Sequence, residues 1–406
     1  MKLCSRCVAP ETALNLSFDH AGVCSLCRTY DRIDPKILAP EMLRPLLEER
    51  FERFRGRSGY DAMVGLSGGK DSSYVALRLV KDYGLRVLLF TYDNGYLTDY
   101  ARHNISLVVE KLGQDHIFLG PDSDVQRCIA RSSVRRVGVP CIGCTFPGFV
   151  MVMKTAIERG IPFIVHGRSP AQMFKEIAPG SVDPFLPFIK GNLQPRDDQQ
   201  VREFVLKSSR KLMKRLRWLV GADLNGDIAG KIQNSYCPDW AKAKSSAVVP
   251  EFLAFYLFEP YDENHIKQTL ETRLQWVRPE DNRFMGHEDC TVHPVSVYLY
   301  TSIYGHPILQ PELATLVRQG RLSREEALAR LTAEKEKDAC NEVSLQHLQN
   351  VTGMSRDEIF ALNHRARSRL TLMRTSLKLL SPAMIPWLNR LLPAQFAIET
   401  CDWLWR

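Results

Sequence analysis

The stretch Ser67-Gly68-Gly69-Lys70-Asp71-Ser72-Ser73 decides how the surrounding chain folds. It follows an apolar run, residues 60–66, that predicts a buried strand, and it leads into a run from about Ser72 to Tyr83 that predicts a helix. Glycines let the backbone approach a phosphate closely, and the start of a helix offers unpaired N–H groups and the positive end of its dipole. Lys70 adds a positive charge, and the serine hydroxyls add donors. These residues therefore predict an anion-binding loop.

Strand and helix patterns alternate after this loop. Beyond the strand that ends at Leu66, strands are predicted at 86–92, 116–119 and 161–166, and helices at 72–83, 98–112, 123–136 and 148–159. Nearly continuous apolar strands that alternate with helices predict an α/β fold with a doubly wound parallel sheet, covered by helices on both faces. Ligands of such sheets bind beyond the carboxyl ends of the strands. One cleft is therefore expected to be lined by residues 67–71, Asp93, residues 140–145, Gly167 and Arg168.

Composition places the chain among ordinary globular proteins. Its 406 residues are 45% hydrophobic and 25% charged, which excludes a disordered chain. The net charge of +8 suits a phosphate-bearing substrate without requiring a nucleic acid. No signal peptide follows Met1, and no apolar run reaches the length of a membrane span, so we expect a cytoplasmic protein with no membrane partner. In that compartment, eleven cysteines favour metal or redox chemistry over a disulfide framework.

The first cysteines form two closely spaced pairs. Cys4-x2-Cys7 is followed, after sixteen residues, by Cys24-x2-Cys27, a spacing typical of a four-cysteine zinc knuckle. A segment this small cannot bury enough apolar surface to fold unaided, so bound Zn2+ would supply the folding energy. Four thiolate ligands leave no open coordination position, and the predicted role is structural. The alternatives are unliganded thiols and disulfides.

The loop resembles a known family signature. It lacks the four residues that the Walker pattern places between its first glycine and the Gly-Lys pair. It is similar instead to the S-G-G-x-D-S signature of the PP-loop superfamily, the HUP-like ATP pyrophosphatases or adenine nucleotide alpha hydrolases. The resemblance implies cleavage of ATP between its α and β phosphates, adenylation of a carbonyl or carboxyl oxygen, and release of AMP and pyrophosphate. It implies that Lys70 and Asp71 are catalytic, that Asp71 orients Mg2+, and that the ATP-binding residues are Ser67, Gly68, Gly69, Lys70, Asp71, Ser72, Ser73, Asp93, Gly167 and Arg168.

This resemblance and the patterns above divide the chain into four segments. We predict a zinc module at 1–32, a linker helix at 33–57, a PP-loop ATP-binding domain at 58–195 and a mainly helical C-terminal region at 196–406. The strand pattern fades after about residue 195. A basic helix is predicted at 199–220, where the alternatives are an RNA-binding stripe and a solvated helix face.

The N-terminal sequence resembles one branch of the superfamily. Cys4-Ser5-Arg6-Cys7-Val8 and the segment from Phe18 to Cys24 are similar to the opening of bacterial N-acetyl sugar amidotransferases. Those enzymes replace an amide oxygen with nitrogen. The resemblance implies an ammonia-donor protein, a glutaminase, as a partner.

A second cysteine pair resembles another branch. Cys141-x2-Cys144 lies between two predicted helices at the cleft end of the sheet. Sulfur-transferring PP-loop enzymes, such as tRNA thiouridine synthetases, hold a [4Fe-4S] cluster with such a pair and a third, distant cysteine. The resemblance implies Cys237 as the third ligand, with Cys290 as its rival. The alternatives are a persulfide carried by the pair, a buried structural pair and a second zinc site.

The segment after the fourth strand departs from the thiolase pattern. Gly167-Arg168-Ser169 replaces the Gly-His-Asn and following acidic residues of many superfamily thiolases. Arg168 is expected instead to contact a phosphate of ATP or of the substrate. No second RNA-binding module is recognisable, which favours a small-molecule or nucleotide substrate over tRNA. The tail around Trp387 and Trp403 could dock a partner or a second subunit, as in a homodimer, or pack on the chain's own core.

Three functions are compatible with these residues. The first is an ATP-dependent sulfur transferase that adenylates the oxygen of an amide-like carbonyl and replaces it with sulfur from a donor, through Cys141, Cys144 and a third cysteine. The second is an N-acetyl sugar amidotransferase that forms an acetamidino sugar and needs no cluster. The third is a nucleotide-binding protein that keeps the loop without turnover.

Overall fold

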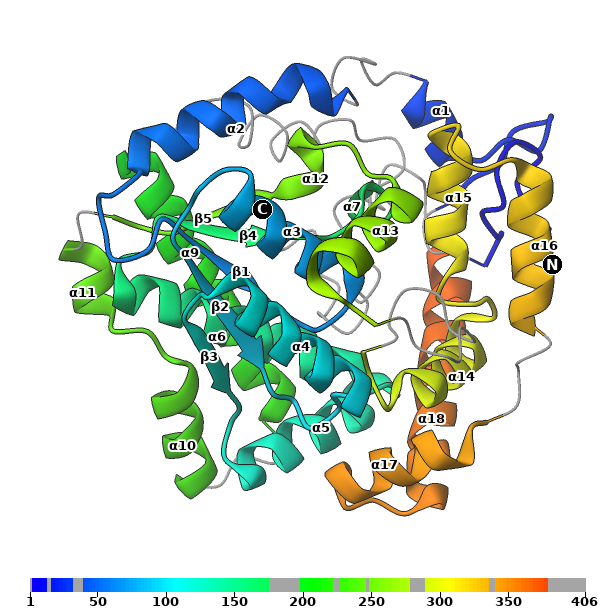
Figure 1. Cartoon of the computed structure of the whole chain (residues 1–406). Helices are drawn as coiled ribbons and strands as arrows, with labels where there is room; N and C mark the ends of the chain where they lie inside the picture. The colour runs from blue at the N-terminus through cyan, green and yellow to red at the C-terminus, as the bar shows by residue number, and fades with distance from the viewer. Residues whose placement is uncertain are drawn as a thin grey trace.

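The computed structural model describes residues 2–12, 16–31, 39–174, 198–221, 226–245, 248–277, 289–335 and 340–378. The predicted C-terminal tail around Trp387 and Trp403 lies outside these residues, as do 175–197 of the predicted ATP-binding and C-terminal segments. Figure 1 shows a central sheet with helices around it and the N-terminal module beside α15 and α16.

The sheet has five strands in the order β3-β2-β1-β4-β5, and every neighbouring pair is parallel. The register pairs Val64 with Leu89 of β2 and with Val165 of β4. The predicted doubly wound parallel sheet is therefore confirmed. The strands are β1 (Ala62–Gly65), β2 (Val87–Tyr92), β3 (His116–Leu119), β4 (Phe163–His166) and β5 (Glu251–Ala254).

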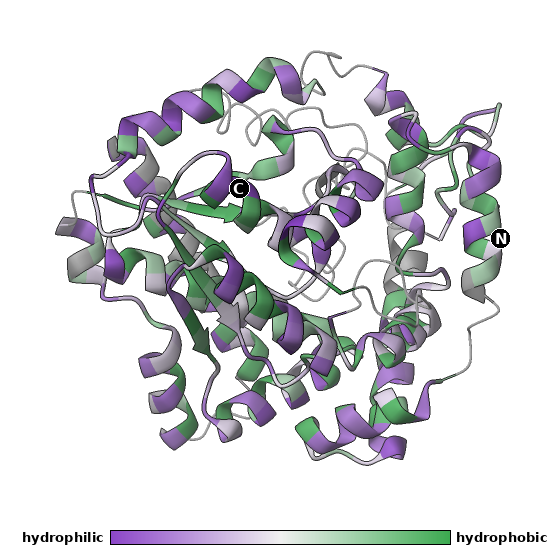
Figure 2. Cartoon of the chain, viewed as in Figure 1, coloured by the Kyte–Doolittle hydropathy of each residue, from purple (hydrophilic) through white to green (hydrophobic). Residues whose placement is uncertain are grey.

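Alternate residues of the strands enter two separate cores. Val64, Leu89 and Val165 belong to one, and Met63, Leu88 and Ile164 belong to the other. Because side chains alternate across a strand, a sheet buried on both faces needs apolar residues at nearly every position. The hydropathy colouring shows the result, with hydrophobic strands at the centre and mixed colours on the surrounding helices (Figure 2).

Helices cover both faces. Elements packed into the first core are α1 (Ser25–Tyr30), α2 (Pro40–Phe54), α3 (Lys70–Lys81), α4 (Asp99–Leu112), α12 (Phe255–Phe258), α13 (Glu263–Leu274), α15 (Gln310–Arg318) and α16 (Arg324–Lys335). Those of the second core are α5 (Ser123–Val137), α6 (Cys141–Arg159), α9 (Asp198–Val220), α10 (Gly226–Tyr236), α11 (Trp240–Ser245), α14 (His293–Tyr304), α17 (Glu342–Thr352) and α18 (Arg356–Lys378). The short helix α7 (Pro170–Phe174) follows β4.

The structure adds one strand that the sequence patterns did not predict. β5 lies at an edge of the sheet, where Ile164 pairs with Phe252 and Val165 with Leu253. The strand β5 runs directly into α12 without a turn between them, so the apolar run at 252–258 gives no separate strand signal. The region after residue 195 is mainly helical, but it completes the sheet through β5.

The helix α6 begins at Cys141, seven residues before the predicted start at 148. Gly143 and Pro147 weaken the helical pattern of this segment. The contact with α5 explains the glycine at this position: a Cβ at Gly143 would lie 2.9 Å from Ser133 Cβ and 3.0 Å from Ile129 O of α5. Glycine is therefore required where the two helices cross closely.

Among the described residues, α6 is the one helix long and apolar enough to cross a membrane. Buried core helices pass the same test of length and composition, so α6 does not overturn the expectation of no membrane span. Within the protein, 65% of the most apolar 18-residue window of this helix is buried. Val150, Met153 and Ile157 pack into the second core, so burial against the sheet accounts for its apolar composition.

A buried carboxylate joins three elements of the first face. Glu259, 1% exposed, follows α12 and forms ion pairs with Arg44 of α2 at 2.9 Å and Arg78 of α3 at 3.4 Å. The hydroxyl of Tyr83 donates a further hydrogen bond to it. A buried charge is tolerated when opposite charges and donors satisfy it, so this group fixes α2 and α3 against the end of β5.

We predict that Glu259→Gln lowers the free energy of unfolding by about 2–3 kcal/mol, because two partly buried guanidinium groups lose their counter-charge. Urea unfolding followed by circular dichroism measures the change. The matched control is Glu52→Gln, which breaks a solvent-exposed pair with Arg55 and should leave the stability nearly unchanged. Equal effects of the two substitutions would contradict the assigned role of Glu259.

Candidate functional site

The anion-binding loop lies between β1 and α3, at the carboxyl end of the sheet. Helix α3 begins at Lys70, with Gly69 as its N-cap. Within the loop, the Ser67 N–H donates to Ser72 Oγ at 3.2 Å, and the Gly69 N–H donates to Ser67 Oγ at 3.3 Å. Ser73 is fully buried beneath the loop. Ser67 and Ser72, which are partly exposed, therefore stabilise the loop through hydrogen bonds within it.

Gly68 carries the tightest contact of the loop. Its φ is +81°, and a Cβ there would lie 2.3 Å from Ala101 O of α4. Its carbonyl oxygen accepts hydrogen bonds from Trp276 Nε1 at 3.0 Å and from Asn104 Nδ2 at 3.4 Å. A left-handed backbone in van der Waals contact with a helix requires glycine. Trp276 and Asn104 thus fix the loop, and no sequence pattern had indicated either.

Both oxygens of the Asp71 carboxylate have partners. Lys70 Nζ lies 3.3 Å from Oδ2, and the Tyr261 hydroxyl donates to Oδ1 at 3.2 Å. Burial raises the pKa of Asp71, while the Lys70 charge opposes the rise. The charge of Glu263, on α13, also raises the pKa of Asp71. Burial raises the pKa of Glu263 itself, but the nearby Lys70 charge lowers it, and the resulting pKa lies below its usual value. Lys70, Asp71, Tyr261 and Glu263 therefore form one polar group beside the loop.

The segment after β4 meets this group. A Cβ at Gly167 would lie 2.8 Å from Asp71 O, so glycine allows the two backbones to touch. The N–H of Arg168 donates to His166 Nδ1 at 3.4 Å. Burial, followed by the Arg168 charge, lowers the pKa of His166 to about 3, so this imidazole is neutral at physiological pH. Gly167 and Arg168 thus lie beside the loop, as the topology predicted.

Asp93 directly follows β2 and begins the turn after it. Its Oδ1 accepts from the Gly95 N–H at 3.0 Å, and its carboxylate lies 3.4 Å from Arg102 Nη2. These contacts give Asp93 a turn-forming role, which was one of its two predicted roles. Its contact with a nucleotide stays a prediction.

The second cysteine pair lies in the first turn of α6. Asn94 Nδ2, in the turn after β2, donates to Cys144 Sγ at 2.6 Å. The Gly143 N–H donates to Ser133 Oγ at 3.0 Å, which fixes the start of the helix against α5. Burial raises the pKa of the Cys144 thiol to about 12, although the Asn94 hydrogen bond opposes the rise. A bound cation would be needed to hold Cys144 as a thiolate at neutral pH.

Cys290 joins the pair from a distant part of the sequence. Leu97 and Cys290 form an antiparallel bridge, and the Thr291 N–H donates to Tyr96 O at 2.7 Å. After burial, the charge of Cys144 is the largest factor raising the pKa of Cys290, and Cys141 adds to it. The three thiols therefore share one electrostatic environment.

Asp289 links the cysteines to the anion-binding loop. Its backbone oxygen accepts from the Thr98 N–H at 3.2 Å, next to the Leu97–Cys290 bridge. A Cβ at Gly69 would lie 3.7 Å from Asp289 Oδ2. One dipeptide, Asp289-Cys290, thus borders both the loop and the cysteine pair.

Cys237 has different neighbours. It follows α10, its sulfur accepts from Trp240 Nε1 at 3.1 Å, and it packs against the second core. The neighbouring Tyr236 lies nearer the pair: its hydroxyl is 3.0 Å from that of Tyr92, and burial, with a smaller effect of the Cys144 charge, raises its pKa. Of the two predicted candidates, the structure brings Cys290 into the electrostatic environment of the pair.

The three cysteines do not form a compact single-ion site. In the described part of the chain, one group of three or more potential ligands has all its atoms within 4.8 Å of one another, and it is the N-terminal cysteine group. Cys141, Cys144 and Cys290 are not part of that group.

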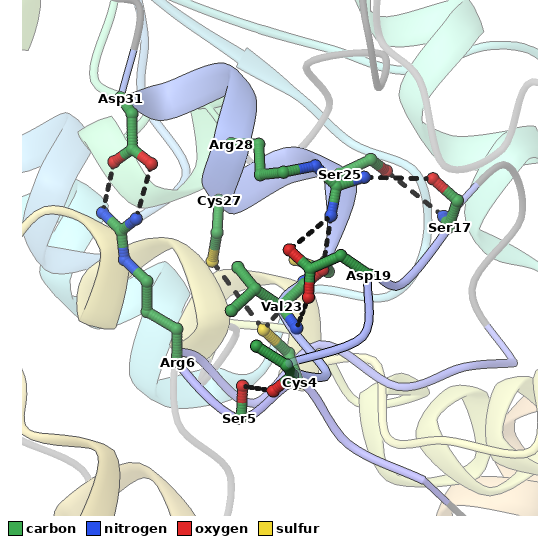
Figure 3. Close-up of polar contacts among 12 residues, drawn as sticks. Cys4, Ser5, Arg6, Ser17, Asp19, Val23, Ser25, Cys27, Arg28 and Asp31 are labelled. Atoms are coloured by element: carbon green, nitrogen blue, oxygen red, sulfur yellow. Dashed lines mark hydrogen bonds and ion pairs between the residues drawn. The ribbon is translucent and has the colours of Figure 1, made fainter.

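The N-terminal cysteines have the opposite geometry. Cys4 Sγ lies 3.9 Å from Cys27 Sγ, and Cys7 Sγ lies 3.8 Å from Cys24 Sγ; all four are fully buried. Metal–sulfur bonds of about 2.3 Å give a tetrahedral edge of about 3.8 Å, so the four sulfurs fit one zinc-sized ion. Around them, Arg6 pairs with Asp31 and Arg28 with Asp19 across the module (Figure 3).

The module is fixed to the helices α15 and α16. Arg324 Nε donates to Cys7 O at 3.2 Å, and Arg318 Nη1 donates to Cys7 Sγ at 3.5 Å. Gln310 Nε2 donates to Val8 O at 2.7 Å. A guanidinium beside a sulfur stabilises the thiolate form, so these helices complete the environment of the four cysteines.

Comparisons with known proteins give two similarities. No protein-family model matches the chain. A stretch of 167 residues is 26% identical to the uncharacterised protein MJ1599 of Methanocaldococcus jannaschii; it covers 40% of this chain and 58% of that protein, less than two thirds of its length. The U34-tRNA thiolase NcsA of Methanococcus maripaludis, solved with its [4Fe-4S] cluster, is similar with 13% identity and a TM-score of 0.33, over 88% of this chain and 99% of the thiolase. A likeness this low carries no functional argument, so the function rests on the residues of this chain.

We predict that Gly68→Ala destabilises the protein by more than about 2 kcal/mol, because alanine is strained at positive φ and would clash with α4. It should also abolish stabilisation by ATP, measured as the shift in thermal unfolding temperature. The control is Gly65→Ala at the end of β1, where a Cβ meets no atom within 4 Å. If Gly68→Ala responded to ATP as the control does, the loop would not be the nucleotide site.

Proposed function

We propose that this chain is a PP-loop, ATP-dependent sulfur transferase, which forms AMP and pyrophosphate and replaces the oxygen of an amide-like carbonyl with sulfur. The observation that carries the proposal is the position of Asp289-Cys290. Asp289 borders Gly69 of the loop, and Cys290 bridges to Leu97 in the same segment whose Asn94 donates a hydrogen bond to Cys144 Sγ. A site for activating an oxygen thus lies beside a site for holding sulfur.

The first half-reaction uses the loop. The acceptor's carbonyl oxygen attacks the α-phosphorus of ATP; the new O–P bond forms as the bond to the β-phosphate oxygen breaks, and pyrophosphate leaves. The N–H groups of the loop and Lys70 would stabilise the developing phosphate charge, and Arg168 could add a second cation. Asp71, fixed by Lys70 and Tyr261, would orient Mg2+ through water.

The second half-reaction uses the cysteines. A hydrosulfide sulfur adds to the adenylated carbon, the C–O bond breaks with its electron pair going to AMP, and the S–H proton passes to solvent. A [4Fe-4S] cluster held by Cys141, Cys144 and Cys290 would leave one iron open as a Lewis acid for sulfur. Support for this ligand set comes from the segment 94–97, where Asn94 donates to Cys144 Sγ and Leu97 bridges to Cys290.

The basic helix α9 supports a small-molecule or nucleotide acceptor over a large RNA. Several of its cations have partners within the protein. Arg202 donates to Lys244 O at 2.8 Å, Arg217 donates to Gln233 Oε1 at 2.8 Å, and Arg210 lies over the Trp240 ring. These contacts explain part of the basic stripe as structural, which leaves less of it to neutralise a phosphate backbone.

For the N-terminal module we propose a structural Zn2+ bound by Cys4, Cys7, Cys24 and Cys27. The two measured sulfur separations support it, because they match the edge of a zinc–thiolate tetrahedron. Four thiolates leave no position for substrate, so the ion would stabilise the module and its contact with α15 and α16.

We predict that anaerobically purified protein contains iron in addition to zinc, with an absorption band near the visible region that disappears in Cys290→Ser. Cys237→Ser is the matched control and should retain the iron, because the Cys237 sulfur accepts a hydrogen bond from Trp240 instead of binding the cluster. Iron analysis and electron paramagnetic resonance measure both variants. Release of AMP and pyrophosphate, measured for both variants with one carbonyl acceptor, should fall at least tenfold in Cys290→Ser.

A colourless, zinc-only protein whose activity survives Cys141→Ser would contradict the sulfur-transferase proposal and support the N-acetyl sugar amidotransferase instead. That enzyme would consume ammonia and would not need the second cysteine pair. Mass spectrometry of the product distinguishes the two, since sulfur and nitrogen give different masses.

We also predict that Cys27→Ser removes one equivalent of zinc and lowers the thermal unfolding temperature, because the module then loses the metal that holds it against α15. Elemental analysis and calorimetry measure the two effects. Ser25→Ala, on the same short helix, should keep the zinc. Unchanged zinc content in Cys27→Ser would show that the four sulfurs are not the zinc site.

A further inference from the structure

Tyr96 has a buried hydroxyl, and its backbone is hydrogen-bonded to the segments that contact Cys144 and carry Cys290. Its side chain is 3% exposed, and its OH has no hydrogen-bond partner in the described part of the chain. A buried hydroxyl without a partner is costly and uncommon, and it calls for a ligand that satisfies it. Tyr92, four residues earlier, shows the usual arrangement, because its buried hydroxyl is paired with that of Tyr236.

Backbone contacts fix Tyr96 between two of the three cysteines. Its N–H donates to Asn94 Oδ1 at 2.9 Å, and the same Asn94 side chain donates to Cys144 Sγ. Its carbonyl oxygen accepts from the N–H of Thr291, which follows Cys290. The next residue, Leu97, forms the bridge to Cys290. The ring is therefore anchored by the elements that carry the cysteines.

Electrostatics keep the Tyr96 hydroxyl protonated. Burial raises its pKa well above the usual value, and the charges of Cys144, Cys290 and Cys141 raise it further. A phenol that keeps its proton can donate one hydrogen bond. The chemistry that suits it is a negatively charged sulfur.

We infer that the hydroxyl of Tyr96 binds the sulfur nucleophile of the reaction, donating a hydrogen bond to a hydrosulfide held among Cys141, Cys144 and Cys290. This inference rests on the proposed function and identifies its sulfur donor as a small inorganic sulfide. Tyr96 keeps its proton throughout, because hydrosulfide supplies its own electron pair and loses its own proton when the C–S bond forms. The hydrogen bond is made only when sulfur is bound.

The test compares Tyr96→Phe with Tyr256→Phe in protein purified without oxygen. Tyr256 is 1% exposed, and its hydroxyl also lacks a partner in the described part of the chain, but it belongs to the core on the other face of the sheet. Sodium hydrosulfide is titrated against each iron-loaded protein and followed by absorption and paramagnetic resonance. Urea unfolding of the metal-free proteins gives a second readout.

We expect Tyr96→Phe to keep the wild-type iron content and to bind hydrosulfide about tenfold more weakly, because a hydrogen bond to an anion is lost. Both variants should have raised urea midpoints without metal, because each loses a buried, unpaired hydroxyl. Tyr256→Phe should bind hydrosulfide as tightly as the wild type.

Equal hydrosulfide affinity of Tyr96→Phe and wild type would overturn the inference, and so would loss of iron from Tyr96→Phe, which would assign the hydroxyl to cluster assembly. Iron-loaded wild type that does not bind hydrosulfide would overturn it while leaving a sulfur transferase with another donor. Wild type that holds no iron overturns the proposed function itself, and the two failures are thereby distinguished.

Discussion

The short antiparallel contact between residues 96–98 and 289–291 is the constraint on which the site depends. The Thr291 N–H donates to Tyr96 O at 2.7 Å, and the Thr98 N–H donates to Asp289 O at 3.2 Å. These two bonds bring Cys290 to the cysteine pair and Asp289 to the loop at Gly69. Without them, the loop and the cysteine pair would be connected only through the sheet, and Cys290 would not be held beside this segment.

Glycine provides the remaining close approaches. Gly68 touches α4, Gly167 touches the backbone of Asp71, and Gly143 touches α5. At each position a Cβ would lie 2.9 Å or less from a neighbouring heavy atom, so any other residue would push two elements apart. Close contacts at these glycines therefore hold the elements of the site together. This arrangement also places polar backbone groups at the cleft.

The N-terminal module is connected to the loop through α15 and α16. Arg324 holds the carbonyl groups of Cys4 and Cys7, and Arg321, in the turn before α16, donates to Tyr261 O at 3.3 Å. The hydroxyl of Tyr261 in turn donates to Asp71. The N-terminal module can thus influence the orientation of the loop carboxylate from a distant part of the chain, because these hydrogen bonds connect the two.

Local sequence by itself determined the strands from β1 to β4, the loop, the parallel topology and the four N-terminal thiols, because periodicity, glycines and cysteine spacing are short-range signals. It also named Cys290, but only as the rival of Cys237. The tertiary structure decided which of the two approaches the pair, added β5 and the early start of α6, and brought in Asn94, Tyr96, Trp276 and Tyr261. Those residues carry no local signal, since their roles arise from contacts between segments that only folding brings together.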